Sequence, residues 1–266
     1  MILIDGRKAR EHFLPILQAK IKALSSTPTL AIIQVGDRED STAFIKAKKS
    51  FAQKIGAKEI HIKLSENVSQ EEVVDIIARF NNDKNIHGII VQLPLPKHLN
   101  SDEIISHINS KKDVDGLTNG SPYLAATARG ISQLLDFYNI ALLDKKVVVV
   151  GRSKLVGTPI AQMCKKAGAK VEVCHKETRD MPSITKNADV VIIATGMAKF
   201  FDMKYFTEGQ VVIDVGISRL DENLVGDVDF ENVKDFVRMI TPVPGGVGQM
   251  TVLALFENLV DACMVQ

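Results

Sequence analysis

Residues 146–166, KVVVVGRSKLVGTPIAQMCKK, join a run of valines to a glycine-containing loop and the first turns of a helix. A strand that ends in glycine and passes through a short loop into a helix is typical of α/β domains that bind nucleotides. Backbone N–H groups point outward at the helix start, and the helix dipole favours a phosphate there. Gly151 and Gly157 are spaced as G-x5-G rather than G-x-G-x-x-G, so the loop is also compatible with a strand–helix turn that binds nothing.

Strands and helices alternate on both sides of this loop, which is the pattern of an α/β protein. Several expected strands are continuous Val and Ile runs, typical of a parallel sheet that helices cover on both faces. Ser69 with Glu72, and Asn100 with Glu103, have capping-box spacing and predict two helix starts. The expected strands are residues 30–35, 59–64, 88–92, 146–150, 170–174, 189–194 and 210–215.

Two domains are expected, because residues 117–130, LTNGSPYLAATARG, have no strong helical or strand period and are typical of a connection. The first domain covers residues 1–120 and is joined by a last helix, residues 249–266. The second covers residues 121–248, contains the glycine loop and is Rossmann-like. Two α/β lobes of this kind are expected to leave a cleft between them.

Composition narrows the class of protein. The chain has 266 residues, 45% of them hydrophobic, and a net charge of +1, which argues against a protein that coats nucleic acid. No stretch is expected to be long enough to span a bilayer, and the first residues, MILIDGRKAREHF, lack the pattern of a secretory signal. Cys164, Cys174 and Cys263 have no CxxC spacing, so we expect no disulfide framework, no metal site and a reducing, cytoplasmic location.

The strand after the glycine loop, residues 170–174, is followed by His175 and Lys176. A NAD site usually has an acidic side chain at the end of this strand, where it holds the ribose 2′-hydroxyl. Arg152, His175 and Lys176 would instead suit a 2′-phosphate and predict NADP, although Lys176 could also be an ordinary solvated lysine. Two later strand ends, ATG at 194–196 and DVGIS at 214–218, place glycine where a ligand could approach the backbone.

Lys48 is the first candidate for chemistry outside the glycine loop. Asp40 or Ser41 is expected to cap a helix that Gly56 ends. One face of this helix is expected to carry Phe44, Lys48, Phe51 and Ile55. A lysine on such a face either extends its ammonium into water or is partly desolvated, with a lowered pKa that suits proton transfer.

Three further segments are more specialised than ordinary loops. Gln92 ends an apolar strand and opens LPLP, where its amide can bind a polar ligand or hold a lysine. KDVDG, residues 112–116, is either a ligand-binding carboxylate turn or a charged surface turn capped by Asp113. TPVPGGVGQMT, residues 241–251, combines prolines, glycines and a helix start, as in a loop that closes over a ligand.

Together these segments resemble the methylenetetrahydrofolate dehydrogenase/methenyltetrahydrofolate cyclohydrolase family. The similarity runs from IDG at residues 4–6 to the last helix. Six motifs in the family's order carry it: S-x6-K (Ser41–Lys48), VQLPLP (91–96), KDVDG (112–116), GRSKLVGTP (151–159), DVGIS with VGDVDF (214–218 and 225–230), and TPVPGGVG (241–248).

The resemblance implies NADP-dependent oxidation of 5,10-methylenetetrahydrofolate to 5,10-methenyltetrahydrofolate, and hydrolysis of that product to 10-formyltetrahydrofolate. It implies a first domain that binds folate, a second that binds NADP, and a homodimer formed through the cofactor domains. Catalytic roles are implied for Lys48, Gln92 and Asp115. Substrate contacts are implied for Phe44, Leu93, Pro244, Gly245 and Gly248. Cofactor contacts are implied for Gly151, Arg152, Ser153, Val156, His175, Lys176, Thr195, Gly196, Gly216, Ile217 and Thr251.

The chain departs from the family pattern at three places. Phe44 replaces a tyrosine, Gln249 replaces a proline, and ATARG at 126–130 stands where CTPRG is typical. The missing tyrosine hydroxyl predicts a weakened cyclohydrolase. Two alternatives stay open from the sequence: an NADP-dependent dehydrogenase of a different small substrate, such as a shikimate-like or amino-acid compound, and a cofactor-binding regulator without turnover.

Overall fold

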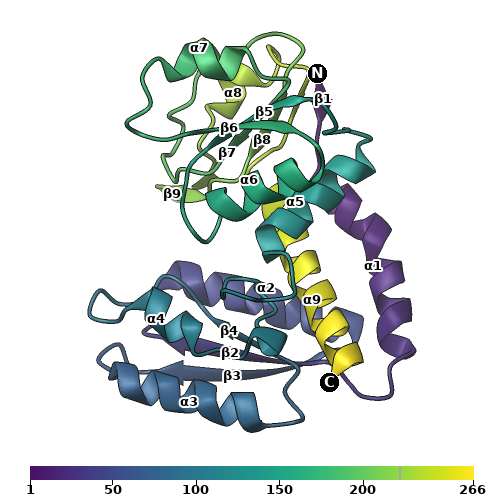
Figure 1. Cartoon of the computed structure of the whole chain (residues 1–266), viewed down its shortest axis with the longest axis vertical. Helices are drawn as coiled ribbons and strands as arrows, with labels where there is room; N and C mark the ends of the chain where they lie inside the picture. Colours follow the sequence, from purple (N-terminus) through teal and green to yellow (C-terminus); the bar gives the residue numbers. More distant parts are fainter. Residues whose placement is uncertain (222) are drawn as a thin grey trace. The chain divides into compact units, whose positions relative to one another are not determined.

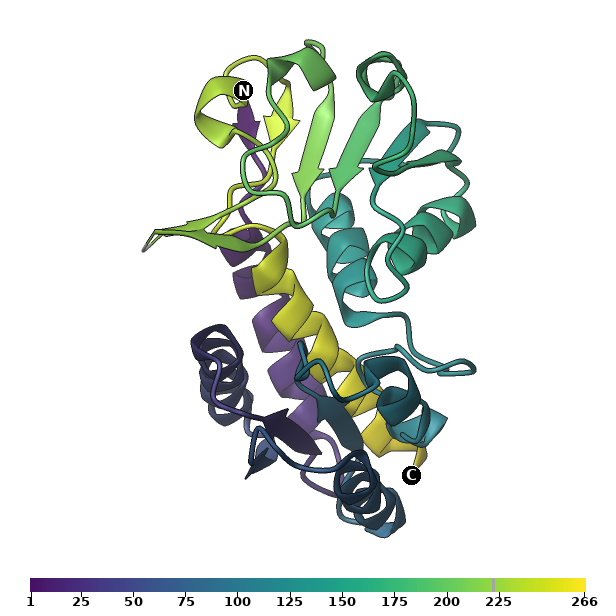
Figure 2. The ribbon, with the colours of Figure 1, turned by 90° about the vertical axis from the view of Figure 1, so that its left-hand side faces the viewer.

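The computed structural model describes residues 1–221 and 223–266. The chain divides into two compact units, each an α/β unit with its own parallel sheet (Figures 1 and 2). The six-stranded unit contains residues 1–12 and 127–251, and the three-stranded unit contains residues 13–126 and 252–266. The chain passes from one unit to the other within helices α1 (Gly6–Lys22) and α9 (Val247–Val265) and at the start of α5 (Ala126–Phe137).

The six-stranded unit has the strand order β1-β11-β8-β7-β5-β6, with all pairs parallel. Strands β6 and β7 lie on opposite sides of β5, so the order reverses there, and such a switch point is where open α/β sheets bind ligands. The strands are β1 (Ile2–Leu3), β5 (Lys146–Val150), β6 (Lys170–Cys174), β7 (Val190–Ile193), β8 (Val211–Asp214) and β11 (Met239–Ile240).

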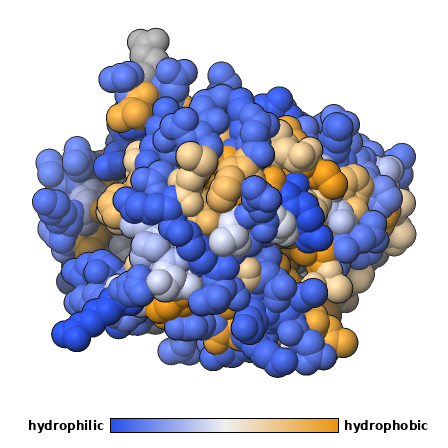
Figure 3. Space-filling model, turned by 90° about the horizontal axis from the view of Figure 1, so that it is seen from above, coloured by the Kyte–Doolittle hydropathy of each residue, from blue (hydrophilic) through white to orange (hydrophobic). Residues whose placement is uncertain are grey.

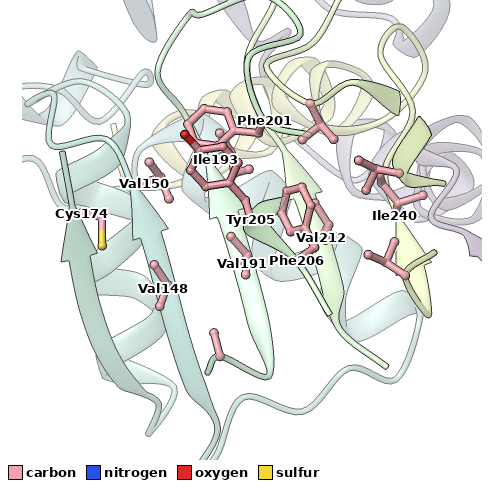
Figure 4. Packing of buried hydrophobic residues seen from close by; sticks show 14 residues of the cluster. Val148, Val150, Cys174, Val191, Ile193, Phe201, Tyr205, Phe206, Val212 and Ile240 are labelled. Atoms are coloured by element: carbon pink, nitrogen blue, oxygen red, sulfur yellow. The ribbon is translucent and has the colours of Figure 1, made fainter. Parts of the chain in front are cut away.

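Helices cover both faces of this sheet. On one face lie α7 (Met181–Lys186), α8 (Phe230–Val233) and the short helix η2 (Met203–Tyr205). On the opposite face lie α5 and α6 (Gly157–Lys166) (Figure 1). Figure 4 shows the valines and isoleucines of the central strands packed against Phe201, Tyr205 and Phe206. The surface of the chain drawn in Figure 3 is mainly hydrophilic, with separate apolar groups, because the apolar sides of the helices face the sheet.

The three-stranded unit has the parallel order β3-β2-β4, formed by β2 (Thr29–Val35), β3 (Lys58–Leu64) and β4 (Gly88–Val91). Helices α3 (Gln70–Asn82) and α4 (Ser101–Ser106) bury their apolar residues on one face, and α2 (Glu39–Ile55) covers the other (Figure 1). The later part of α9 completes this core, where Phe256 packs on Phe51 with ring centroids 5.4 Å apart. A short helix η1 (Ser110–Lys112) precedes the connection to α5.

The strands expected from the apolar runs all form, with ends that differ by at most one residue. The two predicted capping residues are confirmed, because Ser69 Oγ accepts from Glu72 N and Asn100 Oδ1 accepts from Glu103 N. The predicted start of α2 is wrong: the helix begins at Glu39, and Asp40 pairs with Arg38 at 2.6 Å instead of capping. Gly56 ends α2 in the left-handed region, as predicted, with φ of 81°.

The division between the units differs from the expected one at residue 120. Helix α5 begins at Ala126 and includes Gly130, where a Cβ would lie only 2.7 Å from the backbone of Met250. Residues 1–12 belong to the six-stranded unit rather than to the first domain, because β1 pairs with β11. The hairpin of β9 (Ser218–Leu220) and β10 (Asn223–Val225) was not expected either.

Helix α9 is longer and more apolar than the sequence analysis expected of any segment. Over residues 1–221 and 223–266, it is the one helix long and apolar enough to cross a membrane, although the sequence had suggested no such stretch. About two thirds of it, 67%, is buried inside the protein, as in the core helix of a folded domain. Cys164, Cys174 and Cys263 are free and buried.

Candidate active site and cofactor site

Lys48 and Gln92 meet in the three-stranded unit. Lys48 projects from α2, and Gln92 follows β4 directly, with its backbone N–H bonded to Ile33 O at 2.8 Å. Lys48 Nζ donates to Gln92 Oε1 at 2.8 Å. The amide nitrogen of Gln92 donates to Leu93 O at 2.8 Å, which leaves the amide oxygen for the lysine. The structure therefore brings together the lysine and the amide that the sequence singled out.

The two carboxylates of KDVDG have different surroundings. Asp113 builds the turn: one oxygen accepts from Gly116 N at 3.0 Å, and the other accepts from Thr118 N at 2.7 Å and Thr118 Oγ1 at 2.8 Å. Asp115, by contrast, interacts electrostatically with Lys48. Asp113 is therefore a turn residue, but it is buried rather than at the surface, and the charge of Asp115 lies close enough to act on Lys48.

Burial shifts the pKa values of this pair toward each other. Removal from water lowers the pKa of Lys48 from its ordinary value, and the charge of Asp115 opposes that shift. Burial raises the pKa of Asp115, Lys48 opposes the rise and Asp113 adds to it. A half-buried amine with a lowered pKa and a fixed partner suits proton transfer better than a lysine extended into solvent does.

Phe44 lies one helical turn before Lys48. The sequence predicted it on the buried face of α2, and this prediction is wrong. The side chain is 40% exposed, so its ring is available to a ligand. The buried residues of α2 are Ser41, Ile45, Phe51, Ala52 and Ile55. Ser41 Oγ is itself buried and has no hydrogen-bond partner among the described residues. Leu93 follows Gln92 and joins Pro94 through a cis peptide bond.

The glycine loop is closely packed at the switch point between β5 and β7. Gly151 has φ of 121°, and a Cβ there would lie 2.2 Å from Ala194 O. A Cβ on Gly157 would lie 2.2 Å from Gly151 O. Ser153 Oγ accepts from the backbone N–H groups of Val156 and Gly157 at 3.3 and 3.2 Å. Both glycines are therefore required by backbone contacts, as the loop sequence suggested.

The predicted cofactor contacts beyond these strand ends lie in the loops after β7 and β8 and in α9. A Cβ on Gly196, just after β7, would meet no described atom within 4 Å, so the backbone there is open to a ligand. Gly248 lies beside Ile217, since its Cβ would be 3.4 Å from the Ile217 Cδ1. Thr251 donates its hydroxyl to Val247 O within α9 at 3.3 Å. Among residues 1–221 and 223–266, no three His, Cys, Asp or Glu side chains gather as metal ligands.

The loop 241–248 is built against the first residues of the chain. Gly6 N donates to Gly245 O at 2.9 Å, and a Cβ on Gly6 would lie 2.1 Å from Gly246 O. Pro244 is exposed and joined to Val243 by a cis peptide bond. Gln249 N donates to Gly246 O at 3.1 Å, a bond that a proline at this position could not make.

Arg152 and His175 come together at the ends of β5 and β6, which pair in parallel up to Val150 and Cys174. Lys176 is exposed beside them. The structure adds a residue that the sequence reasoning missed: Glu177 Oε2 lies 3.5 Å from Arg152 Nη2 and 3.8 Å from His175 Nδ1. The sequence CHKET (174–178) could have indicated this residue, because Glu177 directly follows the two basic residues.

Asp214 and Asp227 form a second feature that the sequence reasoning did not single out, although both lie in the motifs. Asp227 Oδ2 accepts from Thr195 N, Thr195 Oγ1 and Gly196 N at 2.6, 2.9 and 3.0 Å. Asp214 accepts from the N–H groups of Gly216, Asp227 and Val228. Burial raises the pKa of Asp214 to about 7, against the effect of these hydrogen bonds. The two side chains join the loops after β7 and β8.

Two domains of one known protein family match the chain. Residues 4–115 match the catalytic domain of tetrahydrofolate dehydrogenase/cyclohydrolase, and residues 125–266 match the NAD(P)-binding domain of the same enzymes. The chain belongs to this family. It is 45% identical over 268 residues to the bifunctional protein FolD of Acholeplasma laidlawii, covering 97% of this chain and 96% of that protein.

Solved structures agree with this assignment. The bifunctional enzyme FolD of Campylobacter jejuni superposes with a TM-score of 0.96 at 39% identity, covering 100% of this chain and 99% of that one. The Trypanosoma brucei enzyme, complexed with NADP and an inhibitor, has a TM-score of 0.93 at 30% identity, covering 100% and 98%. The family resemblance and the two-domain α/β fold predicted from the sequence are confirmed. The chain is an enzyme of a dehydrogenase and cyclohydrolase family, and the alternatives of an unrelated dehydrogenase and a regulator without turnover are set aside.

Proposed function

We propose that this chain oxidises 5,10-methylenetetrahydrofolate with NADP and hydrolyses the methenyl product to 10-formyltetrahydrofolate at a centre formed by Lys48, Gln92 and Asp115. The observation that carries the proposal is the 2.8 Å bond from Lys48 Nζ to Gln92 Oε1, beside the charge of Asp115. NADP, when bound, supplies the acceptor for the hydride that the folate nitrogen lone pairs expel.

In the oxidation, the chain's residues mainly bind and orient, because hydride transfer depends on proximity and alignment. The loop from Gly151 to Ser153 would hold the pyrophosphate with its backbone and the start of α6. Arg152, His175 and Lys176 would hold the 2′-phosphate. The rest of the cofactor would lie along Val156, Thr195, Gly196, Gly216, Ile217 and Thr251.

In the hydrolysis, a proton must leave the attacking water and another must reach the nitrogen that departs when the ring opens. The Lys48 amine has a lowered pKa, so its neutral form can accept the first proton. Gln92 Oε1 and Asp115 then stabilise the ammonium, which can return a proton to the nitrogen. Phe44, Leu93, Pro244, Gly245 and Gly248 are the proposed substrate contacts, with the pterin near Asp115.

Lys48→Met tests this proposal, because methionine keeps much of the side-chain volume and removes the amine. We expect hydrolysis of methenyltetrahydrofolate to fall about a hundredfold or more, the usual contribution of a general acid–base. Hydride transfer should fall much less, since it depends on alignment. Ultraviolet absorbance with methylenetetrahydrofolate and NADP follows the appearance and the decay of the methenyl product separately.

Lys46→Met is the matched control, because Lys46 is exposed on the same helix. It should leave both rates unchanged. Equal retention of both activities in Lys48→Met would remove Lys48 from the hydrolytic role. Absence of methenyl formation in the unaltered enzyme would remove the proposed oxidation.

The proposal extends to the state of the enzyme in the cell. A homodimer formed through the cofactor domains is supported by β6, an edge strand of the six-stranded sheet with Val173 38% exposed. Comparing the sedimentation of the unaltered chain with that of Val173→Lys would test it.

A cytoplasmic location, with no nucleic-acid or membrane partner, is supported by the balanced charge and three free cysteines. Cell fractionation would test it.

A further inference from the structure

The corner proposed for the adenosine ribose contains an acid among its bases. Glu177 Oε2 lies 3.5 Å from Arg152 Nη2 and 3.8 Å from His175 Nδ1. The backbone fixes this arrangement: Glu177 N donates to His175 Nδ1 at 3.3 Å, and His175 N donates to Thr178 Oγ1 at 2.9 Å. The turn after β6 therefore directs the carboxylate toward the two groups that a 2′-phosphate would need.

The ion pair between Arg152 and Glu177 is weak enough for a bound phosphate to replace the carboxylate. The side chains of Arg152 and Glu177 are 59% and 64% exposed, and ion pairs between exposed groups add little to stability. A phosphate is doubly charged and accepts bidentate hydrogen bonds from a guanidinium, so it can displace the carboxylate from Arg152. The displaced carboxylate stays next to the phosphate on the same turn, where like charges repel.

A ribose without the phosphate presents a different partner. The 2′-hydroxyl of NAD can donate a hydrogen bond to a carboxylate, and this is the usual function of an acidic residue after the second strand of such domains. Glu177 lies three residues beyond Cys174, the last residue of β6, and within the same corner. One carboxylate can therefore hinder the phosphate of NADP and serve the hydroxyl of NAD.

We propose that Glu177 is a specificity-determining residue that competes with the 2′-phosphate for Arg152 and accepts from the 2′-hydroxyl, so that the enzyme uses NAD as well as NADP. The inference rests on the proposed function, because it takes the ribose corner to lie at the ends of β5 and β6. Arg152 and Lys176 keep NADP the preferred cofactor, and Glu177 keeps that preference small.

Glu177→Gln tests the inference, because it removes the charge and keeps the size of the side chain. The ratio of kcat/KM with NADP to kcat/KM with NAD should rise about tenfold, with tighter NADP and weaker NAD each contributing about threefold. The unaltered enzyme should prefer NADP by less than about a hundredfold, and its preference should fall as salt is added. Titration of NADPH and NADH fluorescence measures the same selectivity without turnover.

Glu208→Gln is the matched control. Glu208 is exposed in the same unit and precedes β8, so it lies at the amino ends of the parallel strands, whereas Glu177 follows the carboxyl end of β6. It changes the net charge equally and should leave the ratio unchanged. In Arg152→Gln, adding Glu177→Gln should improve NADP binding less than it does in the unaltered enzyme, because the competition for Arg152 is gone.

The outcomes separate this inference from the proposed function. An unchanged binding ratio in Glu177→Gln, or an equal change in Glu208→Gln, would overturn the role of Glu177. An enzyme that binds both nucleotides but fails to oxidise methylenetetrahydrofolate would contradict the proposed function, and the fluorescence titration would still decide the role of Glu177.

Discussion

Phe44 is the single residue with the most direct consequence for the balance of the two reactions. It lies on α2, four residues before Lys48 and thus on the neighbouring turn, and its ring is 40% exposed. The tyrosine of the family pattern would add a hydroxyl close to the amine and to a bound folate. Phenylalanine keeps the ring for packing and lacks that polar group.

Phe44→Tyr should therefore raise the hydrolysis of methenyltetrahydrofolate. A hydrogen bond to a charged group contributes about 1.5–3 kcal/mol, which corresponds to a rate increase of about tenfold or more. Hydride transfer should change little, so the two rates are measured on the same preparation. Phe51→Tyr is not a control, because that ring is buried; Phe44→Leu, which also lacks a hydroxyl, should show no gain. An equal rise in both rates would show that the hydroxyl is not what limits hydrolysis.

The residues of the proposed site differ in how far they could be predicted from the sequence. Lys48 and Gln92 stand out locally, since one interrupts a helical apolar stripe and the other ends an apolar strand. The predicted burial of Phe44 was wrong, because the helical spacing of four residues does not fix which edge of their shared face is buried. Glu177 was missed because the turn after β6, and not the strand itself, brings it back to Arg152.

Among the elements, the ends of β7 and β8 depend on the buried pair Asp214 and Asp227. Burial raises the pKa of Asp214 to about 7, far above the ordinary value of an aspartate. In the folded protein it therefore keeps a proton that it loses in the unfolded chain at intermediate pH. The contribution of Asp214 to the free energy of unfolding is fully present below about pH 4 and is lost as the pH rises to about 7.

The free energy of unfolding should accordingly fall between pH 5 and 7 in the unaltered protein, by up to about 1.4 kcal/mol per pH unit from this group. Asp214→Asn has no proton to lose, so its stability should depend less steeply on pH over the same range. Urea unfolding at several pH values measures both slopes. Asp235→Asn, an exposed change in the same unit, should keep the original slope; identical slopes in Asp214→Asn would contradict the raised pKa.

The elements also show why parts of the fold were predictable. Continuous Val and Ile runs gave the central strands, because burial on both faces of a parallel sheet requires them. Strands β1 and β11 have two residues each, and their pairing depends on residues 237 positions apart, such as Ile2 and Met239. No local pattern indicates such a pair, so the pairing of the first residues with β11 could not be predicted from the sequence.

Across the whole chain, α9 has a role that its sequence does not reveal. Its last part belongs to the three-stranded unit, where Asn258 is fully buried and donates to Val114 O at 2.8 Å and to Leu124 O at 3.0 Å. These carbonyls flank the turn that presents Asp115. A residue 144 positions beyond Val114 therefore holds one end of the turn that carries Asp115.

Asn258→Ala should leave both carbonyls without this donor in a buried place, at a cost of about 1–3 kcal/mol for each unsatisfied group. For a chain of this size, Tm should fall by about 2–4 °C for each kcal/mol lost. The turn should also loosen, so kcat for hydrolysis should fall even at temperatures where the protein stays folded. Met264→Ala, an exposed change on the same helix, should leave both Tm and kcat unaltered. A lowered Tm with unchanged kcat would show that Asn258 stabilises the core without positioning Asp115, because the carboxylate would then keep its place without the amide.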